Sequence, residues 1–520
     1  MAILMLLMLN SLILGSFPIG DDGVIQAQTR SQARASSVTI TDFQAVGDGV
    51  TRNTEAIQAA IEYQAARGGG MVVVPPGTFI TGTLFLKSGI TLHLEGGAVL
   101  LGSSNLDDYA RYENENQMGM IFAQDQKNLA ITGTGTIDGN GRAFIYPDRV
   151  KDLHPSIKQS TRQGEAYLDT LKGIQDGPVV PFEHKRPYQM LLFSGVDGLV
   201  LKDITIRDSP FWAVHVADSD NIQVSGVTVR NSLLMANADG LNFTSSSNIV
   251  ITGCDIIAGD DALAFSGYST HYELPGYRDI RRTSENISVS NCLLQSRSSG
   301  IRVGGIDQNS LRNYRFDNII IHESNRGIGI FVHQDGSVED VHFSNITIQT
   351  RLHTGDWWGN GEPIHISVIE GAPVEQKLGR LRDVSFTNIR AKSEMGILVY
   401  GDVPGAITRL DFRNVNLQIR NGELQESYGG NFDLRPAVVT EKNIFAHDIP
   451  GIFLRHANDV GLRDVRIQWV DEMHTYFRHG LQAEHVSGLD LRDVTIPAPR
   501  ADETAYSLTD TQFTAGSDVP

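Results

Sequence analysis

Alternation of apolar and polar residues recurs along most of the chain. The repeated motif begins with a polar residue or glycine, continues as apolar–x–apolar, then x and Asn, Asp or Gly, and ends as apolar–x–Ile or Val. Clear copies begin at Asn128, Gly198, Asn221, Asn248, Asn286, Asn318, Asp340, Asp383, Arg409, Asp459 and Gly488. Strict alternation predicts strands with one buried face.

Copies that are not separated by insertions lie 22 to 27 residues apart. A period near 25 residues, with two or three short strands per unit, is typical of a solenoid in which each coil packs only on its neighbours. We therefore expect an all-β fold, a right-handed single-stranded parallel β-helix.

One segment has helical rather than strand periodicity. Residues 54–66 read TEAIQAAIEYQAA, and three glycines follow at 68–70. We expect this helix to cap the N-terminal end of the solenoid, where unpaired strand edges would otherwise be open. Residues 142–187, 268–284 and 425–450 interrupt the repeat, and we interpret them as loops that form the walls of a cleft.

The repeat assigns residues 36–500 to one elongated domain. Residues 1–17 form an apolar run and small residues follow it, so we interpret 1–35 as a secretory signal peptide and leader. No Lys or Arg precedes that run, since the first is Arg30, which leaves an uncleaved anchor or a different start open. No other segment is apolar enough to span a membrane. We expect a polar C-terminal tail at 501–520 and a secreted or periplasmic monomer.

The net charge of the chain limits which kinds of partner it can bind. The chain has 43 Lys and Arg against 61 Asp and Glu, a net charge of −18, and nucleic-acid binding needs a basic footprint instead. The same charge disfavours a polyanionic substrate unless basic groups gather at the site.

Cys254 and Cys292 end equivalent repeat units, so we interpret them as small core residues stacked in neighbouring coils. They would pair in an oxidising compartment if their geometry allowed it.

Three aspartates at fixed spacing are the strongest candidates for chemistry. An Asn-x-Asp-Gly motif at 237–240 places Asp239 22 residues, about one coil, before Asp261 of the Gly-Asp-Asp motif at 259–261. Coils of a parallel sheet stack about 4.8 Å apart, so these carboxylates should cluster. Clustered carboxylates can divide into a proton donor and a proton acceptor, as hydrolysis of a glycosidic bond requires. The alternatives are aspartates that cap turns, or a calcium site.

These motifs, in their context, resemble glycoside hydrolase family 28, the polygalacturonase family. Also similar are FQAVGDGV from Phe43, then TEAIQAAI and VVVPPGTF, and LLFSGVDGLVLKDITIRDSPFWAVHV after Arg186-Pro187. The resemblance covers roughly residues 40–400. It implies hydrolysis with inversion at the anomeric centre, Asp260 as the general acid, Asp239 and Asp261 holding the water, and no metal or other cofactor.

Two departures from the family pattern concern recognition of the sugar. The family's Gly-His-Gly is replaced by Ser298-Ser299-Gly300, and its Arg-Ile-Lys, one coil further, by Gly329-Ile330-Phe331. The histidine would tune the acid, and the arginine and lysine would bind a sugar carboxylate. The departures leave recognition of galacturonate open.

Aligning the repeat units predicts two columns of outward-facing side chains. The first contains Trp212, Asp239, Asp261, Ser299, Arg326 and Glu362, and the second contains His215, Asn242, Ala264, Arg302, Gly329 and His365. A slip of one residue would reverse every face.

From the motifs and columns we predict substrate contacts for Asn237, Arg302, Arg326, Glu362, Trp357 and Trp358. Arg302, beside the space at Gly329, would replace part of the lost contact with an anionic sugar, or it is a surface arginine in a polar stack. Arg326 and Glu362 are also expected to form a structural ion pair. The two tryptophans lie in a glycine-flanked loop and suit stacking on a pyranose, or they form a hydrophobic lid.

We therefore expect a glycoside hydrolase that cleaves an acidic polysaccharide or oligosaccharide, with galacturonate-containing pectin as the first candidate. Two alternatives remain open. A β-helix lyase would use an Arg or Lys base, often with calcium, and a non-catalytic carbohydrate-binding solenoid would bind without cleavage.

Overall fold

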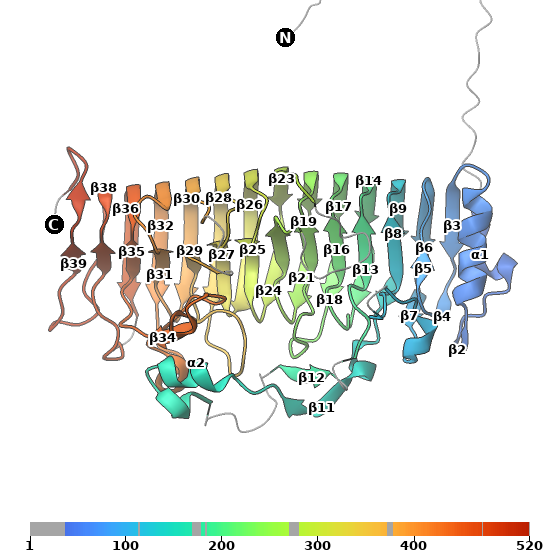
Figure 1. Cartoon of the computed structure of the whole chain (residues 1–520), viewed down its shortest axis with the longest axis horizontal. Helices are drawn as coiled ribbons and strands as arrows, with labels where there is room; N and C mark the ends of the chain where they lie inside the picture. Colours follow the sequence, from blue (N-terminus) through green and yellow to red (C-terminus); the bar gives the residue numbers. More distant parts are fainter. Residues whose placement is uncertain are drawn as a thin grey trace, which may run out of the picture.

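The computed structural model describes residues 37–112, 115–168, 178–181, 185–269, 280–371, 378–470 and 472–518. The predicted signal peptide and leader lie outside the described residues. Figure 1 shows an elongated stack of coils that runs from β3 at one end to β39 at the other. Within the described residues, no helix combines the length and apolar character needed to cross a membrane.

One long parallel sheet carries a single strand from each coil, and it has 13 strands. In spatial order they are β5 (Leu84–Phe85), β8 (Ile121–Gln124), β13 (Leu191–Ser194), β16 (Val214–Ala217), β19 (Leu241–Thr244), β22 (Leu263–Ser266), β25 (Ser299–Gly305), β27 (Arg326–Val332), β29 (Ile364–Val368), β31 (Ile397–Gly401), β35 (Ile452–Arg455), β37 (Leu481–Glu484) and β39 (Tyr506–Thr509).

The other parallel sheet has 23 strands because most early coils contribute two strands to it. Its strands are β1 (Ser37–Thr39), β2 (Asp48–Arg52), β3 (Gly70–Val74), β4 (Gly77–Thr81), β6 (Ile90–Leu94), β7 (Ala98–Gly102), β9 (Lys127–Gly133), β10 (Thr136–Asp138), β14 (Asp197–Lys202), β15 (Thr205–Arg207), β17 (Asp220–Ser225), β18 (Thr228–Arg230), β20 (Ser247–Thr252), β21 (Asp255–Ala258), β23 (Ser284–Ser290), β24 (Leu293–Ser296), β26 (Leu311–Ser324), β28 (Val338–Thr350), β30 (Leu381–Ser393), β32 (Ile407–Ile419), β36 (Ala457–Trp469), β38 (Ser487–Arg492) and β40 (Gln512–Phe513). The predicted parallel β-helix is confirmed.

The predicted cap is present as helix α1 (Thr54–Ala65). Ile57, Ala60, Ile61 and Gln64 are its buried residues, and the helix contacts β1, β3, β5 and β6 of the first coils. In Figure 1 it lies at the N-terminal end of the stack, where it protects the open end of the core.

Asparagines in the repeat have a conformational role. Asn248, Asn286 and Asn313 adopt φ values of 58°, 62° and 59°, a left-handed region that asparagine tolerates better than most residues. Their side chains form a ladder between coils, in which Asn286 Nδ2 donates to Asn248 Oδ1 at 3.0 Å and Asn313 Nδ2 donates to Asn286 Oδ1 at 2.8 Å. Asn318 instead donates to Asn291 within the preceding copy, so this copy of the repeat begins at Asn313 and not at Asn318 as predicted. The polar position at the start of these repeats therefore turns the chain and links successive coils.

The register between coils matches the predicted second column. Backbone pairing joins His215 to Asn242, Asn242 to Ala264, and Ala264 to Arg302, and it then continues to Gly329 and His365. Ser299 pairs with Arg326 in the first column. Cys254 and Cys292 are both buried and free, which agrees with the interpretation as stacked core residues.

The C-terminal boundary differs from the prediction. Residues 501–520 were expected to form a polar tail, but β39 pairs with β37 and β40 pairs with β38. The solenoid therefore extends past residue 500. A terminal coil is covered on one side only, so its residues need less apolar character, and Leu508 in β39 is 38% exposed.

Segments outside the two sheets form one flank of the molecule (Figure 1). They contain the antiparallel pairs β11 (Ile145–Val150) with β12 (Val179–Pro181) and β33 (Asn431–Asp433) with β34 (Ile444–Ala446). They also contain helices α2 (Pro155–Ser160) and α3 (Gln425–Tyr428) and 3-10 turns at Gly141–Phe144, Gly164–Leu168 and Thr440–Lys442. Two further 3-10 turns, Ile40–Phe43 and Leu106–Asp108, lie near the N-terminal coils. Leu153, Tyr167, Leu352, Tyr428 and Ile444 pack together and join these segments.

A stack of phenylalanine rings runs through the core. Phe316, Phe343, Phe386 and Phe412 stack in successive coils with centroid separations of 4.7, 5.0 and 5.0 Å, and Phe386 is completely buried. Stacked rings contribute beyond the area that they bury.

We predict that Phe386→Ala destabilises the protein by about 3–5 kcal/mol, because it removes a ring from the middle of this stack and leaves a cavity. Phe386→Leu should lose less. The control is Val250→Ala, since Val250 is 50% exposed, and this change should shift stability by less than about 0.5 kcal/mol. Urea unfolding followed by circular dichroism measures the differences, and equal midpoints for Phe386→Ala and Val250→Ala would contradict the prediction.

Candidate active site

A cavity of about 280 Å³ opens beside the 13-stranded sheet at β19, β22, β25 and β27. Seven of the nine predicted site residues line it, and Trp357 and Glu362 do not. Its lining residues are Trp212, Asn237, Asp239, Asp260, Asp261, Tyr268, Ser298, Ser299, Arg302, Gly305, Ile306, Arg326, Phe331, His333, Trp358, Arg435 and Pro436.

The three aspartates lie together in this cavity. Asp239 precedes β19 and Asp260 and Asp261 precede β22, and the amide of Gly240 donates to the carbonyl of Asp261 at 2.9 Å. A Cβ at Gly240 would lie 2.3 Å from the carbonyl oxygen of Ala262, so the glycine permits this close approach of the coils. The predicted clustering of the carboxylates is therefore present.

Backbone amides orient two of these carboxylates. Asp260 Oδ1 accepts from the amide of Asp261 at 3.0 Å, and Asp260 Oδ2 accepts from the amide of Asn237 at 3.3 Å. Asp261 Oδ1 accepts from the amide of Ser299, one coil further, at 3.0 Å. Asn237 is itself held by Arg186, whose Nη2 donates to Asn237 Oδ1 at 2.9 Å.

Burial raises the pKa of two carboxyl groups in the cluster. Desolvation and the neighbouring charge of Asp261 raise the pKa of Asp260 to about 7, against the opposing effect of Arg302. Desolvation and the charges of Asp260 and Asp261 raise the pKa of Asp239 well above its ordinary value. Asp260 therefore retains its proton for part of the time near neutral pH, and the neutral form of Asp239 is favoured as well.

Arg302 contacts the cluster directly. Its Nε lies 2.6 Å from Asp261 Oδ2, and its Nη1 and Nη2 donate to Tyr268 Oη at 3.0 Å and Ser266 Oγ at 3.2 Å. Arg302 lines the cavity as predicted, but its nearest charged partner is the protein's own Asp261.

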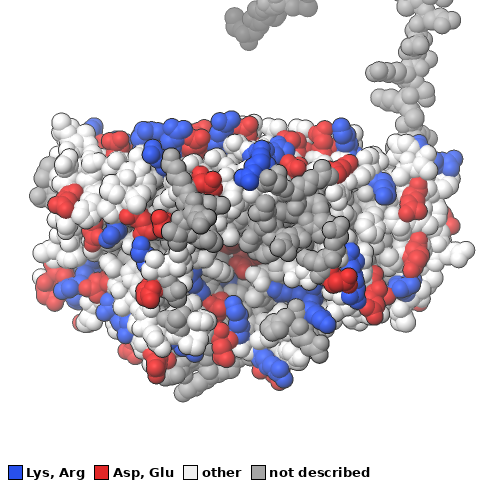
Figure 2. Space-filling model, in the orientation of Figure 1, with Lys and Arg blue, Asp and Glu red and all other residues white. Residues whose placement is uncertain are grey.

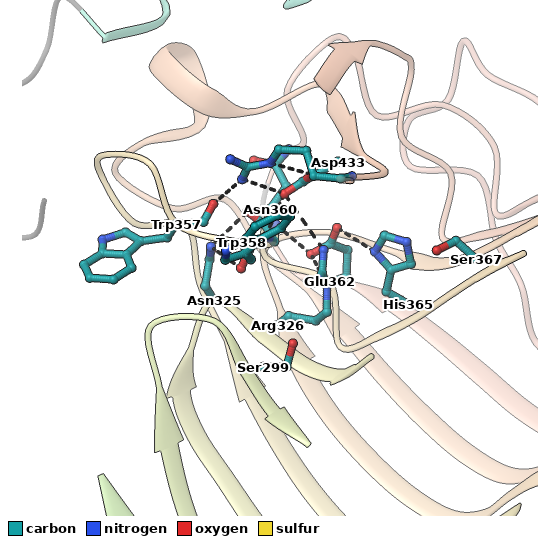
Figure 3. A network of polar contacts seen from close by, with 12 residues as sticks. Ser299, Asn325, Arg326, Trp357, Trp358, Asn360, Glu362, His365, Ser367 and Asp433 are labelled. Atoms are coloured by element: carbon teal, nitrogen blue, oxygen red, sulfur yellow. Dashed lines mark hydrogen bonds and ion pairs between the residues drawn. The ribbon is translucent and has the colours of Figure 1, made fainter. Parts of the chain in front are cut away.

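Arg326 and Glu362 belong to a second network at one end of the cavity (Figure 3). Arg326 Nε lies 3.7 Å from Glu362 Oε2, which agrees with the predicted ion pair. Glu362 is completely buried, accepts from the amide of Asn360 at 2.6 Å, and lies 3.2 Å from His365 Nδ1. Glu362 does not line the cavity, so its position does not support the predicted contact with substrate, and its carboxylate lies beside Arg326 instead.

Asp433 and Arg435 complete this network from a distant part of the chain. Arg435 Nη2 lies 2.9 Å from Asp433 Oδ2, and Arg435 Nη1 lies 2.6 Å from Asp356 Oδ1. The charge of Arg435 keeps the pKa of Asp433 low, at about 2, despite its burial. Asp433 Oδ2 also accepts from the amide of Gly359 at 2.7 Å, which ties the tryptophan loop to β33.

The two tryptophans of this loop have different positions. Trp358 is 36% exposed, lines the cavity, and lies under the guanidinium of Arg435 at 5.0 Å. Trp357 is 3% exposed and does not line the cavity. In Figure 3 the two indoles point in different directions. The position of Trp357 therefore does not support its predicted contact with a sugar, whereas that of Trp358 agrees with it.

Several lining residues were not assigned to the site from the sequence. These residues include two that follow strands of the 13-stranded sheet, Tyr268 after β22 and His333 after β27. Two others, Arg435 and Pro436, follow β33, whose position depends on how segments distant in sequence pack. Phe331 follows directly from the predicted register, because β27 continues from Arg326 through Val332. Among the described residues, no group of three or more His, Cys, Asp and Glu side chains is arranged to hold a metal ion.

Comparison with known proteins agrees with this architecture. A family model described as "Glycosyl hydrolases family 28" matches residues 69–418. A "Probable polygalacturonase" of Vitis vinifera is 29% identical over 61% of this chain and 62% of its own length. An "Exo-poly-alpha-D-galacturonosidase" of Dickeya chrysanthemi is 32% identical over 46% of this chain and 43% of its own length. The chain thus spans less than two thirds of these curated relatives.

Among solved structures, the family 28 exopolygalacturonase of Yersinia enterocolitica is similar in fold. The TM-score is 0.57 at 18% identity, over 93% of this chain and 79% of that one. The family model covers well over half of the 520 residues and includes all three clustered aspartates. The chain therefore belongs to glycosyl hydrolase family 28.

Proposed function

We propose that this protein is a glycoside hydrolase that cleaves an acidic polysaccharide or oligosaccharide of the galacturonate type by single displacement with inversion. The observation that carries the proposal is the buried cluster of Asp239, Asp260 and Asp261 in the wall of an open cavity. The family of the chain and the names of its relatives support the substrate class.

In the proposed reaction, protonated Asp260 gives its proton to the glycosidic oxygen as the bond to the anomeric carbon breaks. A water molecule held by Asp239 and Asp261 attacks that carbon from the opposite face and loses its proton to the carboxylate of Asp261. The pKa of about 7 at Asp260 suits a general acid near neutral pH. The ion pair with Arg302 supports Asp261 as a proton acceptor.

The charges in the cavity support an acidic substrate. The whole chain carries a net charge of −18, and Figure 2 shows both signs interspersed over one face. Arg302, Arg326 and Arg435 nevertheless all line this one cavity. Such a local concentration of guanidinium groups meets the condition that an acidic protein must satisfy to bind a polyanion.

Two other functions make different products. A β-helix lyase would leave an unsaturated sugar, which ultraviolet absorbance detects with and without chelator. A binding solenoid would produce no new reducing ends from any polysaccharide in a panel. The apolar run at 1–17 supports export of the enzyme, and fractionation of the producing cells tests it.

We predict that Asp260→Asn lowers kcat on polygalacturonate by about 10²–10⁴-fold, because it removes the proton donor. A matched control is Asp307→Asn. Asp307 is also buried, with its pKa raised to about 7 by desolvation, but it does not line the cavity. Reducing-end assays should show most of the activity retained in the control. Full activity in Asp260→Asn would exclude Asp260 as the general acid.

The stereochemistry is tested separately. We expect NMR spectra of the first product to show the anomer with inverted configuration.

We also predict the pH dependence of kcat/KM. Activity should fall as pH rises through about 7, because the acid form of Asp260 is lost there. Arg302 lowers the pKa of Asp260, so Arg302→Gln should move this basic limb to higher pH, whatever it does to the maximum rate. Arg455→Gln, which changes a guanidinium on the distant strand β35, should leave the limb in place. A limb that moves to lower pH in Arg302→Gln would contradict the assignment.

A further inference from the structure

The positions at which the chain departs from the family pattern surround a single side chain, Arg326. Ser299 pairs with Arg326 across β25 and β27, and Gly329 and Phe331 follow it along β27. Ser299, Arg326 and Phe331 all line the cavity. The departures therefore lie in one place on the cavity wall.

Gly329 and Phe331 together shape the position of Arg326. The Arg326 guanidinium lies 5.0 Å from the centre of the Phe331 ring, a favourable cation–π distance. A Cβ at position 329 would lie 2.6 Å from that ring and 3.1 Å from Arg326 Cδ. A side chain larger than glycine at 329 would therefore displace the ring or the arginine.

Two carboxylates compensate the charge of Arg326 without hydrogen bonds to it. Glu362 Oε2 lies 3.7 Å from Nε and Asp433 Oδ2 lies 3.9 Å from Nη2, both too long for a hydrogen bond. Arg326 is only 2% exposed, and Nε and Nη2 have no hydrogen-bond partner among the described residues. Buried donors without acceptors are unfavourable, and their presence in a native structure calls for an explanation.

Ser299 extends this set of unused polar groups toward the aspartates. Its Oγ is buried and has no hydrogen-bond partner in the described part of the chain, and its amide donates to Asp261 Oδ1. Asp261, Ser299 and Arg326 lie in successive coils, which places the strand of Arg326 roughly 10 Å from that of Asp261. A sugar next to the scissile bond would reach both Ser299 and Arg326.

We propose that Arg326, assisted by Ser299, binds the carboxylate of an acidic sugar next to the scissile bond. Arg326 would thus replace the Arg and Lys for which this chain has Gly329 and Phe331. The planar guanidinium matches a carboxylate, and Glu362 and Asp433 hold it in position in the absence of substrate. This inference rests on the proposed function for the identity of the sugar.

The test is binding of trigalacturonate and of its methyl ester, measured by calorimetry in an Asp260→Asn background that prevents turnover. Adding Arg326→Gln should weaken binding of the acid by about 10- to 100-fold, the effect of losing a charge-assisted hydrogen bond, and leave binding of the ester unchanged. Arg326→Lys keeps the charge but loses the planar fork, so it should weaken binding of the acid less. It also serves as the decisive variant if Arg326→Gln does not fold.

Arg455→Gln is the matched control. Arg455 lies over the ring of Tyr400 at 5.3 Å and pairs with Glu484 at 2.9 Å, but it does not line the cavity. The control should bind both ligands as the background does. The inference is overturned if the Arg326 variants bind the acid as tightly as the background, if they weaken acid and ester equally, or if the background does not bind trigalacturonate. A different result would separate the two proposals. If binding of the acid depends on Arg326 but the wild-type protein cleaves no polysaccharide, the proposed hydrolase activity is overturned and the inference about Arg326 stands.

Discussion

The backbone hydrogen bonds between successive coils are the constraint on which the rest of the structure depends. They fix which residue of one coil lies beside which residue of the next, and so convert a spacing of 22 residues into the contact between Asp239 and Asp261. The same register stacks Phe316 on Phe343 in the core and Ser299 beside Arg326 on the outside. A parallel ladder thus places the core and the candidate site with one set of interactions.

Burial of charge gives the candidate site its chemistry. The cavity wall desolvates Asp239 and Asp260, which favours their neutral forms, while Arg302 opposes this effect. At the other end, Arg435 and Arg326 keep Asp433 and Glu362 ionised, as the lowered pKa values of these carboxyls indicate. Neighbouring carboxyl groups are therefore divided into proton-holding and charged groups by their nearest arginines.

The loops outside the repeat decide the shape of the cavity. Gly359 binds Asp433 and Asn360 binds the carbonyl of Asn431, so the loop after β28 is attached to the β33–β34 hairpin. Arg162 in turn donates to Gly430, which attaches the segment around α2 to the same hairpin. Three insertions thus form one wall, and that wall carries Trp358 and Arg435 to the cavity.

The sequence by itself determined the coil repeat, the cap helix, the cluster of aspartates and the columns that include Arg302 and Arg326. These features depend on local alternation and on a period that backbone pairing propagates from coil to coil. Only the tertiary structure decided that Trp358 faces the cavity while Trp357 is buried, that Glu362 supports Arg326, and that Arg435 joins the site. These side chains lie in loops or depend on contacts with loops, where no ladder fixes the register and packing between segments distant in sequence sets the orientation. The terminal coil at β39 and β40 was missed for a related reason, since a coil covered on one side needs little of the apolar pattern by which the others were recognised.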